Sequence, residues 1–154
     1  MRARGVFLSV VALAAFSSKG MATAPADQYE RFGPTSDVIV DTKTQLRWQR
    51  FVKDEGVTAA NAVCVPPDGG GVFRLPTVKE LQTLVDEVPT VDGSTYRYLD
   101  PNAFPASMSK VTLPYWTSTN VGQTTQRFVV DFATGATRAA APETSAFVRC
   151  VSGP

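Results

Sequence analysis

The sequence predicts an α+β domain that contains two helices and a small antiparallel sheet. Three patterns carry this prediction. Residues 38–51 alternate apolar and polar side chains in the manner of a β-hairpin. Residues 77–88 begin with a helix-capping signature and continue with apolar side chains at helical spacing. Residues 115–151 contain short alternating stretches between turn residues, which is the pattern of an antiparallel meander.

Residues 1–26 predict a secretory signal peptide. Two arginines precede the apolar run Val6–Phe16, which is too short to span a bilayer. Small residues follow, and we expect cleavage after Ala24 or after Ala26. The second position is preferred because the first leaves Pro25 directly behind the cut. The protein is therefore expected in the periplasm, at the cell surface or in the extracellular medium, with no stable membrane span after processing.

Composition limits the functions that the processed chain can have. Residues 27–36 are expected to form a loose arm, and residues 37–154 the folded domain. Removal of the signal peptide leaves 12 basic and 14 acidic side chains, against 15 and 14 in the whole chain. This balance gives no electrostatic footprint for nucleic acid. The chain has no histidine, which excludes Ser-His-Asp and Cys-His catalysis and His-ligated zinc, and we expect no cofactor or metal.

Cys64 and Cys150 are the two cysteines of the chain. In an oxidising compartment a disulfide between them is the default, and closing a loop of this size is worth roughly 4–5 kcal/mol. The alternative is a redox-active or copper-binding thiol pair. Neither cysteine has a CxxC partner, which favours the disulfide.

The first half of the domain predicts a hairpin and then a helix. Residues 38–40 and 46–51 form the two strands, with Trp48 as a core residue. Residues 56–64 are rich in alanine and predict the first helix, with Thr58 as its N-cap.

The second helix begins at a capping box formed by Thr77 and Glu80 and ends before Pro89. Its polar face is expected to be solvated and carries Lys79, Gln82, Asp86 and Glu87. Its apolar stripe is expected to face the core and consists of Leu81, Leu84, Val85 and Val88.

Residues 89–114 predict a long irregular connection, and such loops are often functional. Asp92, Asp100 and Asn102 carry oxygen ligands suited to calcium, but their spacing is not that of an EF-hand, so turn-capping is the better interpretation. The remaining strands of the antiparallel meander are expected at 115–119, 127–132, 136–140 and 146–151.

Six blocks in one order resemble the Lcl C-terminal domain family, which is named after a bacterial collagen-like adhesin. The resemblance covers about residues 37–152. The most specific blocks are the helix start RLPTVKEL, the strand YWTST and the ending VRCV. The others are VDTKTQLRWQ, AVC and VDFATG.

The resemblance implies an exported domain with a C-type-lectin-like fold, in which the N- and C-terminal strands lie adjacent. It also implies a disulfide from the first helix, at Cys64, to the last strand, at Cys150. Trp116 then falls at a core position. The motifs EPN, QPD and WND of calcium-dependent lectins are absent, and so is a basic cluster like that of a glycosaminoglycan-binding adhesin.

We therefore predict an exported, non-catalytic binding or adhesion module whose ligand is a glycan or protein at the cell envelope. The expected contacts are loop aromatics and amides, because sugar faces stack on aromatic rings and amides fix orientation. These residues are Tyr96, Tyr98, Asn102, Tyr115 and Asn120.

Two alternatives stay open. One is an enzyme, either of the formylglycine-generating type with free Cys64 and Cys150 or a hydrolase using Asp92 and Asp100 as a carboxylate pair. The other is a structural subunit of an envelope or surface assembly, for which self-association is possible.

Overall fold

The computed structural model describes residues 24–25, 27–53, 55–67, 71–105 and 110–153. Apart from Ala24 and Pro25, the predicted signal peptide lies outside these residues. Within the described part of the chain, no helix has the length and apolar character needed to cross a membrane.

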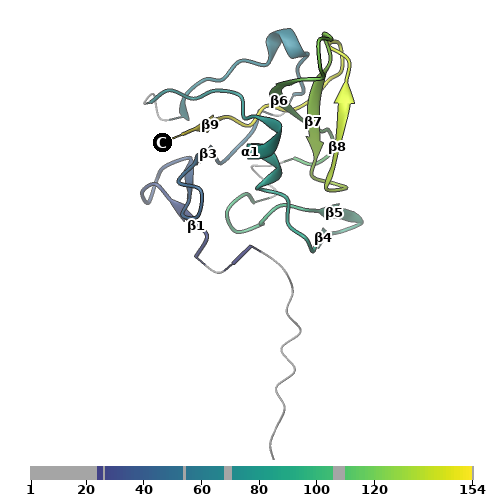
Figure 1. The fold of residues 1–154 in the computed structure, drawn as a ribbon. Coiled ribbons are helices and arrows are strands. Elements are labelled where there is room, and N and C mark those ends of the chain that lie inside the picture. Colours follow the sequence, from purple (N-terminus) through teal and green to yellow (C-terminus); the bar gives the residue numbers. More distant parts are fainter. Residues whose placement is uncertain (1–23, 26, 54, 68–70, 106–109, 154) are drawn as a thin grey trace, which may run out of the picture.

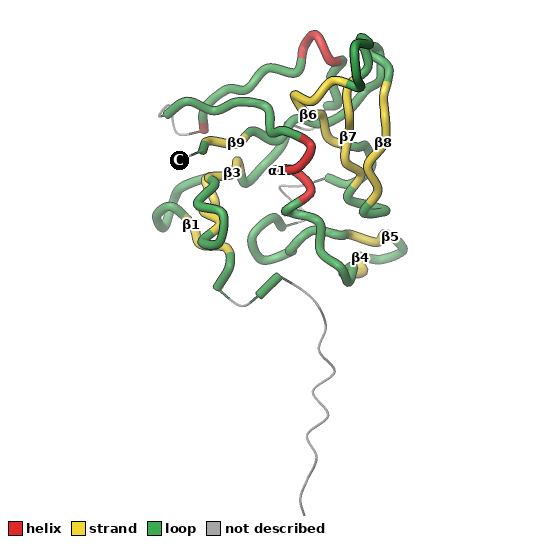
Figure 2. The backbone as a smooth tube through the Cα atoms, viewed as in Figure 1, coloured by secondary structure: helices red, strands yellow, loops and turns green. Residues whose placement is uncertain are grey.

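The described residues form three small antiparallel sheets, one short helix and one 3-10 turn (Figures 1 and 2). The predicted fold class, a C-type-lectin-like arrangement of two helices on one small sheet, is therefore wrong. In chain order the elements are β1 (Tyr29–Arg31), β2 (Val38–Asp41), β3 (Arg47–Gln49), η1 (Ala59–Asn61), α1 (Val78–Gln82), β4 (Thr90–Asp92), β5 (Thr95–Arg97), β6 (Tyr115–Asn120), β7 (Arg127–Asp131), β8 (Ala136–Ala140) and β9 (Val151–Ser152).

The first sheet has the order β1-β2-β3-β9. The predicted hairpin is confirmed as β2 and β3, with Ile39 opposite Trp48. β1 lies inside the segment expected to be a loose arm and pairs with β2. β9 pairs with β3, so the strand at the end of the chain joins the sheet formed by its beginning.

The third sheet has the order β6-β7-β8 and confirms three strands of the predicted meander. The fourth expected strand, residues 146–151, does not extend this sheet as a regular strand. Its residues make isolated bridges from Ala146 to Val57 and from Phe147 to Tyr115, and its end becomes β9. This segment therefore crosses from one sheet to the other, as Figure 1 shows on the way to the C-terminus.

Of the helix predicted at 56–64, only the 3-10 turn η1 forms, because the backbone of this segment pairs with the distant residues Pro142 and Ala146. The N–H of Val57 donates to the Ala146 carbonyl at 2.8 Å, and the N–H of Ala59 donates to the Pro142 carbonyl at 2.9 Å. Thr58 precedes η1 as predicted but makes no side-chain capping bond. Local helix propensity is weak, and tertiary pairing overrides it here.

The second predicted helix is present but short. Its capping box is confirmed: the Thr77 hydroxyl accepts from the Glu80 N–H at 3.2 Å, and Glu80 accepts from the Thr77 N–H at 2.7 Å. Hydrogen bonds from Arg74 and Thr77 hold the pKa of Glu80 at about 2. After Gln82, backbone N–H groups donate to the carbonyls three residues earlier, and the α-helix ends there.

Two apolar clusters lie on opposite faces of the β6-β7-β8 sheet. The larger one fills the space between this sheet, α1 and the first sheet, and it includes Trp48, Leu81, Tyr115 and Phe132. The smaller one packs η1 against the other face and is centred on Trp116. The indole N–H of Trp116 donates to the Val57 carbonyl at 2.7 Å, which confirms Trp116 as a core residue and fixes η1 to the sheet.

The connection at 89–114 is more regular than predicted, because β4 and β5 form a hairpin within it. Asp100 caps the turn that follows, and its carboxylate accepts from the N–H groups of Asn102 and Ala103 at 2.7 and 2.9 Å. Turn-capping was the preferred interpretation of Asp100, and these bonds confirm it.

Candidate binding surface

The outer face of the β1-β2-β3-β9 sheet carries the strand residues that point away from the buried tryptophan of this sheet. Trp48 and Val151 point inward and are fully buried. Residues directly opposite each other on antiparallel strands share a face, so the neighbours of Trp48 and Val151 point outward. The outer face therefore carries Val38, Val40, Arg47, Gln49 and Ser152.

A tethered segment, residues 63–67 and 71–73, lies beside this outer face. The disulfide predicted between Cys64 and Cys150 is confirmed, with Cα atoms 5.7 Å apart. Cys64 lies beyond η1 in irregular chain, and Cys150 immediately precedes β9. The bond therefore ties an irregular segment to the sheet, rather than a helix to a strand.

A groove of about 630 Å³ opens between the tethered segment, β3, β9 and the loop that joins β1 to β2. Its lining combines two aromatic rings, three hydroxyl groups and one guanidinium group. These belong to Phe32, Phe73, Thr35, Ser36, Ser152 and Arg47.

The guanidinium group of Arg47 lies against the aromatic ring of Phe32 in the groove. The Arg47 guanidinium carbon lies 4.5 Å from the centre of the Phe32 ring, a cation–π contact at an exposed site. Phe32 is 54% exposed although it is large and apolar. Arg31 donates to the Ser36 carbonyl at 2.9 Å, which closes the β1–β2 loop on which Phe32 stands.

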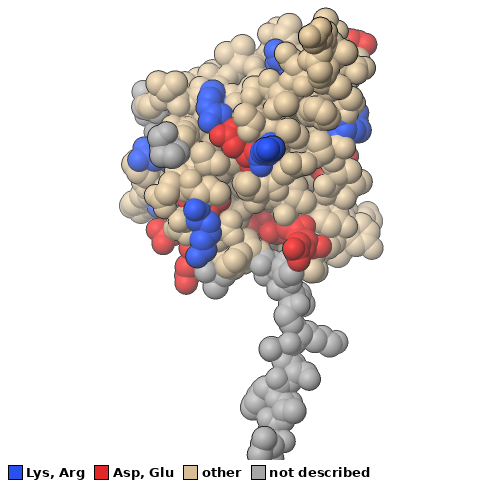
Figure 3. Space-filling view, viewed as in Figure 1, with Lys and Arg blue, Asp and Glu red and all other residues tan. Residues whose placement is uncertain are grey.

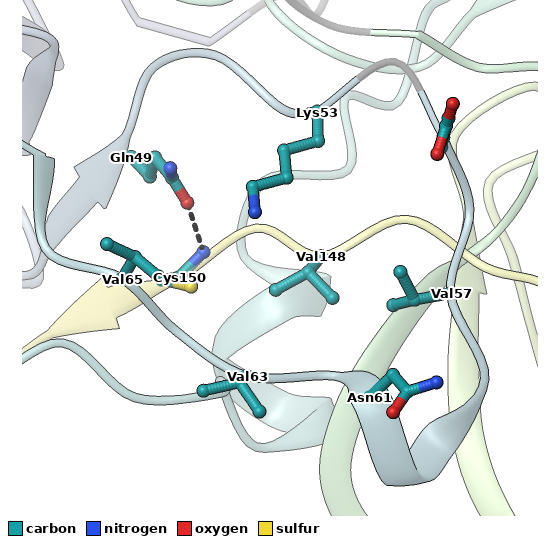
Figure 4. A pocket seen from close by; sticks show the side chains of 9 residues that line it. Gln49, Lys53, Val57, Asn61, Val63, Val65, Val148 and Cys150 are labelled. Carbon is teal, nitrogen blue, oxygen red and sulfur yellow. Dashed lines mark hydrogen bonds between the residues drawn. The ribbon is translucent and has the colours of Figure 1, made fainter.

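A smaller hollow of about 60 Å³ adjoins the disulfide on the same face (Figure 4). Val57, Val63, Val65 and Val148 supply apolar surface there. The Lys53 ammonium points into the hollow, and Gln49 accepts from the Cys150 N–H at 3.3 Å.

Exposed apolar residues gather around these two hollows. Val63 is 69% exposed, Val65 is 59% exposed and Val72 is 85% exposed. Single exposed apolar residues are ordinary, but a group beside a groove marks an interaction surface. We define this surface, the groove and the smaller hollow together, as the candidate binding surface.

The predicted contact residues from the 89–114 connection do not lie on this surface. Tyr96 is 58% exposed on β5, where it pairs with Val91. Tyr98 is half-buried, and its ring lies against the turn at Gly135. Asn102 is exposed in the turn that Asp100 caps. The three share one end of the molecule, near the β4–β5 hairpin.

Tyr115 is fully buried, and its selection as an exposed contact was wrong. Its hydroxyl donates to the Lys110 carbonyl, and burial raises the pKa of this hydroxyl. Arg149, also fully buried, stacks 5.5 Å from its ring. Asn120 is exposed, opposite Arg127. It lies at the far end of the β6–β7 ladder from Tyr98, whose N–H donates to the Phe132 carbonyl.

Sequence patterns did not identify the groove residues, because these residues come from four separate segments of the chain. Phe32 stood in the expected arm, and Phe73 stood directly before the second helix. One signal was available: Arg47 and Gln49 alternate with Trp48, which placed them on the face opposite the core.

Electrostatics do not point to a polyanion surface. On the face in Figure 3, basic atoms lie in separate small groups on a mostly uncharged surface, and acidic atoms lie mainly along its lower edge. Among the described residues, no group of three histidine, cysteine, aspartate or glutamate side chains is arranged to hold a metal ion.

Comparison with known proteins gives a family but no close relative. No curated protein and no solved structure matches the chain. Residues 37–152 match the model of the family described as Lcl C-terminal domain. This match spans three quarters of the chain and includes both cysteines, the residues of the smaller hollow, and Arg47, Phe73 and Ser152 of the groove, whereas Phe32, Thr35 and Ser36 precede it. The chain belongs to the Lcl C-terminal domain family.

Proposed function

We propose that the chain is an exported, non-catalytic binding module that holds a glycan of the cell envelope in the groove beside the disulfide. The observation that carries this proposal is the lining of the groove. Aromatic rings, hydroxyl groups and one arginine open together onto solvent at the same place.

Each group has a part in sugar recognition. The exposed faces of Phe32 and Phe73 offer apolar surface for the C–H face of a sugar ring. Hydroxyl groups of the groove can donate to or accept from sugar hydroxyls, and Arg47 donates only. Because Arg47 already stacks on Phe32, its guanidinium group has lost part of its freedom before a ligand arrives.

A binding role is favoured over a thiol enzyme because the two cysteine sulfurs of the chain are joined in a disulfide. An enzyme of the formylglycine-generating type needs both thiols free. Reduction of the disulfide would have to precede any such activity. The absence of histidine from the chain further narrows the general bases that an enzyme could use.

The test is a glycan array read with the fluorescently labelled domain, followed by calorimetry on the strongest glycan. We expect binding that Phe32→Ala and Arg47→Ala each weaken by at least about tenfold, a loss of roughly 1.4 kcal/mol. Tyr96→Ala is the matched control, because this aromatic residue is equally exposed but lies on the β4–β5 hairpin.

The outcomes separate the possible sites. Loss of binding in Tyr96→Ala with normal binding in Phe32→Ala would move the site to the β4–β5 hairpin, which carries Tyr96, one of the contact residues predicted from sequence. No glycan bound at millimolar concentration would remove the proposal.

A protein contact is the second candidate, and the exposed valines of the tethered segment favour it. Val63, Val65 and Val72 offer apolar surface that a sugar does not need. If this surface joins subunits of an envelope assembly, light scattering after size-exclusion chromatography will show an oligomer. Val72→Asp would then dissociate it, whereas a strict monomer would exclude self-association.

A further inference from the structure

The tethered segment is fixed at its two ends and has few backbone contacts between them. Its C-terminal end joins β9, where Arg74 and Val151 exchange two backbone hydrogen bonds of 2.9 Å. Its N-terminal end follows η1, which packs on the β6-β7-β8 sheet. Between these ends, residues 64–67 and 71–73 make no backbone hydrogen bond to another described segment.

Apolar packing adds little to the attachment of this segment. Val63, Val65 and Val72 are each more than half exposed. A segment with few buried apolar contacts and few backbone hydrogen bonds is among the least stable parts of a fold. The Cys64–Cys150 disulfide is therefore the main attachment of the tethered segment to the sheet.

Both hollows of the candidate binding surface take part of their lining from the tethered segment. Pro67, Gly71 and Phe73 line the groove. Val63 and Val65 are two of the four valines that line the smaller hollow. If the segment leaves the sheet, the groove loses one wall and one of its two aromatic rings, and the smaller hollow loses half of its apolar lining.

The disulfide borders the smaller hollow, because Cys150 is one of the lining residues (Figure 4). Cys64 is half-buried, whereas Cys150 is only 1% exposed. The Cys64 side of the bond is therefore the side that is open to an incoming thiolate. The Lys53 ammonium points into the same hollow, and an ammonium group stabilises a neighbouring thiolate.

We propose that the Cys64–Cys150 disulfide is a site of thiol–disulfide exchange with a dithiol reductant, and that its oxidation state decides whether the candidate binding surface is assembled. A thiolate of the reductant attacks the Cys64 sulfur, the S–S bond breaks, and the electron pair leaves on the Cys150 sulfur. The second thiol of the reductant then displaces Cys64 from the mixed disulfide. The domain ends with two thiols, which carry the two protons of the reductant, and the reductant ends as a disulfide.

The reduced domain keeps its core, because neither apolar cluster contains a residue of the tethered segment. Ala62 and Leu75, which lie on either side of the segment, belong to the smaller cluster or pack against it, so the ends of the segment stay in place. Reduction then frees the segment without removing a core contact. What the assembled surface binds rests on the proposed function, whereas the exchange itself does not.

The experiment compares amide hydrogen exchange, read by mass spectrometry, in the oxidised protein and in the protein reduced with dithiothreitol. Alkylation counts the thiols. We expect both thiols to be released without denaturant, and amide exchange in the tethered segment to become at least about tenfold faster. Exchange in β7 and the emission of the buried Trp48 and Trp116 should not change. No glycan is present, so this result and the glycan result fail independently.

A pair of lysine variants tests the role of the charge in the hollow. Lys53→Gln should slow the reduction by at least about threefold, because the departing Cys150 thiolate loses a neighbouring positive charge. Lys43→Gln is the matched control, since Lys43 is an exposed lysine between β2 and β3 that lines neither hollow. Equal reduction rates in the two variants would overturn the assignment of Lys53.

Three outcomes would overturn the proposal as a whole. Thiols that appear only in denaturant would show that the disulfide is closed to a reductant. Faster amide exchange throughout the domain would show that the bond holds the core and not the tethered segment alone. Unchanged amide exchange of the segment in fully reduced protein would show that other contacts hold it on the sheet.

Discussion

Loss of the Cys64–Cys150 disulfide should strongly destabilise the domain. The bridge closes a loop with a sequence separation of 86. In the chain-entropy model, a loop of that length stabilises the folded state by about 4.5 kcal/mol, because the unfolded chain is restricted. For a domain of this size the corresponding fall in thermal midpoint is roughly 15–20 °C.

The assay is urea unfolding followed by tryptophan fluorescence. Both tryptophans, Trp48 and Trp116, are fully buried, so their emission reports on the two core clusters. The double variant Cys64→Ser with Cys150→Ser is compared with the oxidised wild type. Reductant should bring the wild type to the stability of the variant and leave the variant unchanged.

The slope of the unfolding free energy against urea should rise in the variant. An unfolded chain without the cross-link exposes more surface, and this slope scales with the surface exposed. A loss below about 1 kcal/mol with an unchanged slope would refute the reasoning, because the closed loop would then not limit the unfolded chain.

Three further changes follow from single contacts. Trp116→Phe should lower the free energy of unfolding in urea by about 1 kcal/mol more than Trp48→Phe does. The reason is that, of the two indole N–H groups, only that of Trp116 donates to a described partner, the Val57 carbonyl. Equal losses in the two variants would contradict this. Gly56→Ala should cost about 1–3 kcal/mol in the same assay, since an added Cβ would overlap the side chains of Ser145 and Leu113. Wild-type stability of this variant would show that these two side chains move aside freely. Asp86→Asn in the full chain should stabilise the protein above pH 6 by on the order of 2 kcal/mol. In the folded protein the pKa of Asp86 is about 6, above its ordinary value of 3.8, so ionisation of Asp86 destabilises the wild type progressively as the pH rises from about 4 to about 6. A thermal-shift series in which the difference in midpoint between Asp86→Asn and the wild type does not depend on pH would contradict this prediction.

The elements that the sequence predicted correctly are those with local physical causes. The hairpin of β2 and β3 follows from strict alternation around Trp48, and the start of α1 follows from the Thr77–Glu80 capping box. Three meander strands follow from alternating patterns between turn residues. Each of these signals involves residues within a few positions of one another, and in these elements no distant pairing overrode it.

The elements that the sequence predicted wrongly were decided by distant partners. Residues 56–64 have helical composition, but Ala146 and Pro142 accept their N–H groups and draw the backbone into an extended path. The helix at α1 stops early, and the N–H of Asp86 donates to the Tyr98 carbonyl instead of continuing the helix. Tyr115 is indistinguishable from an exposed loop tyrosine in sequence, yet its ring is packed between Phe132 and Phe147.

Sequence alone determined the family, the pairing of Cys64 with Cys150 and the placement of Trp48 and Trp116 in the core. The tertiary structure decided which surface lies open. Phe32, Arg47 and Phe73 are far apart along the chain, and they meet because β9 returns to β3 and the disulfide holds the intervening segment beside them. The shape of the groove depends on contacts between segments that are distant in sequence, and no local sequence pattern encodes such contacts.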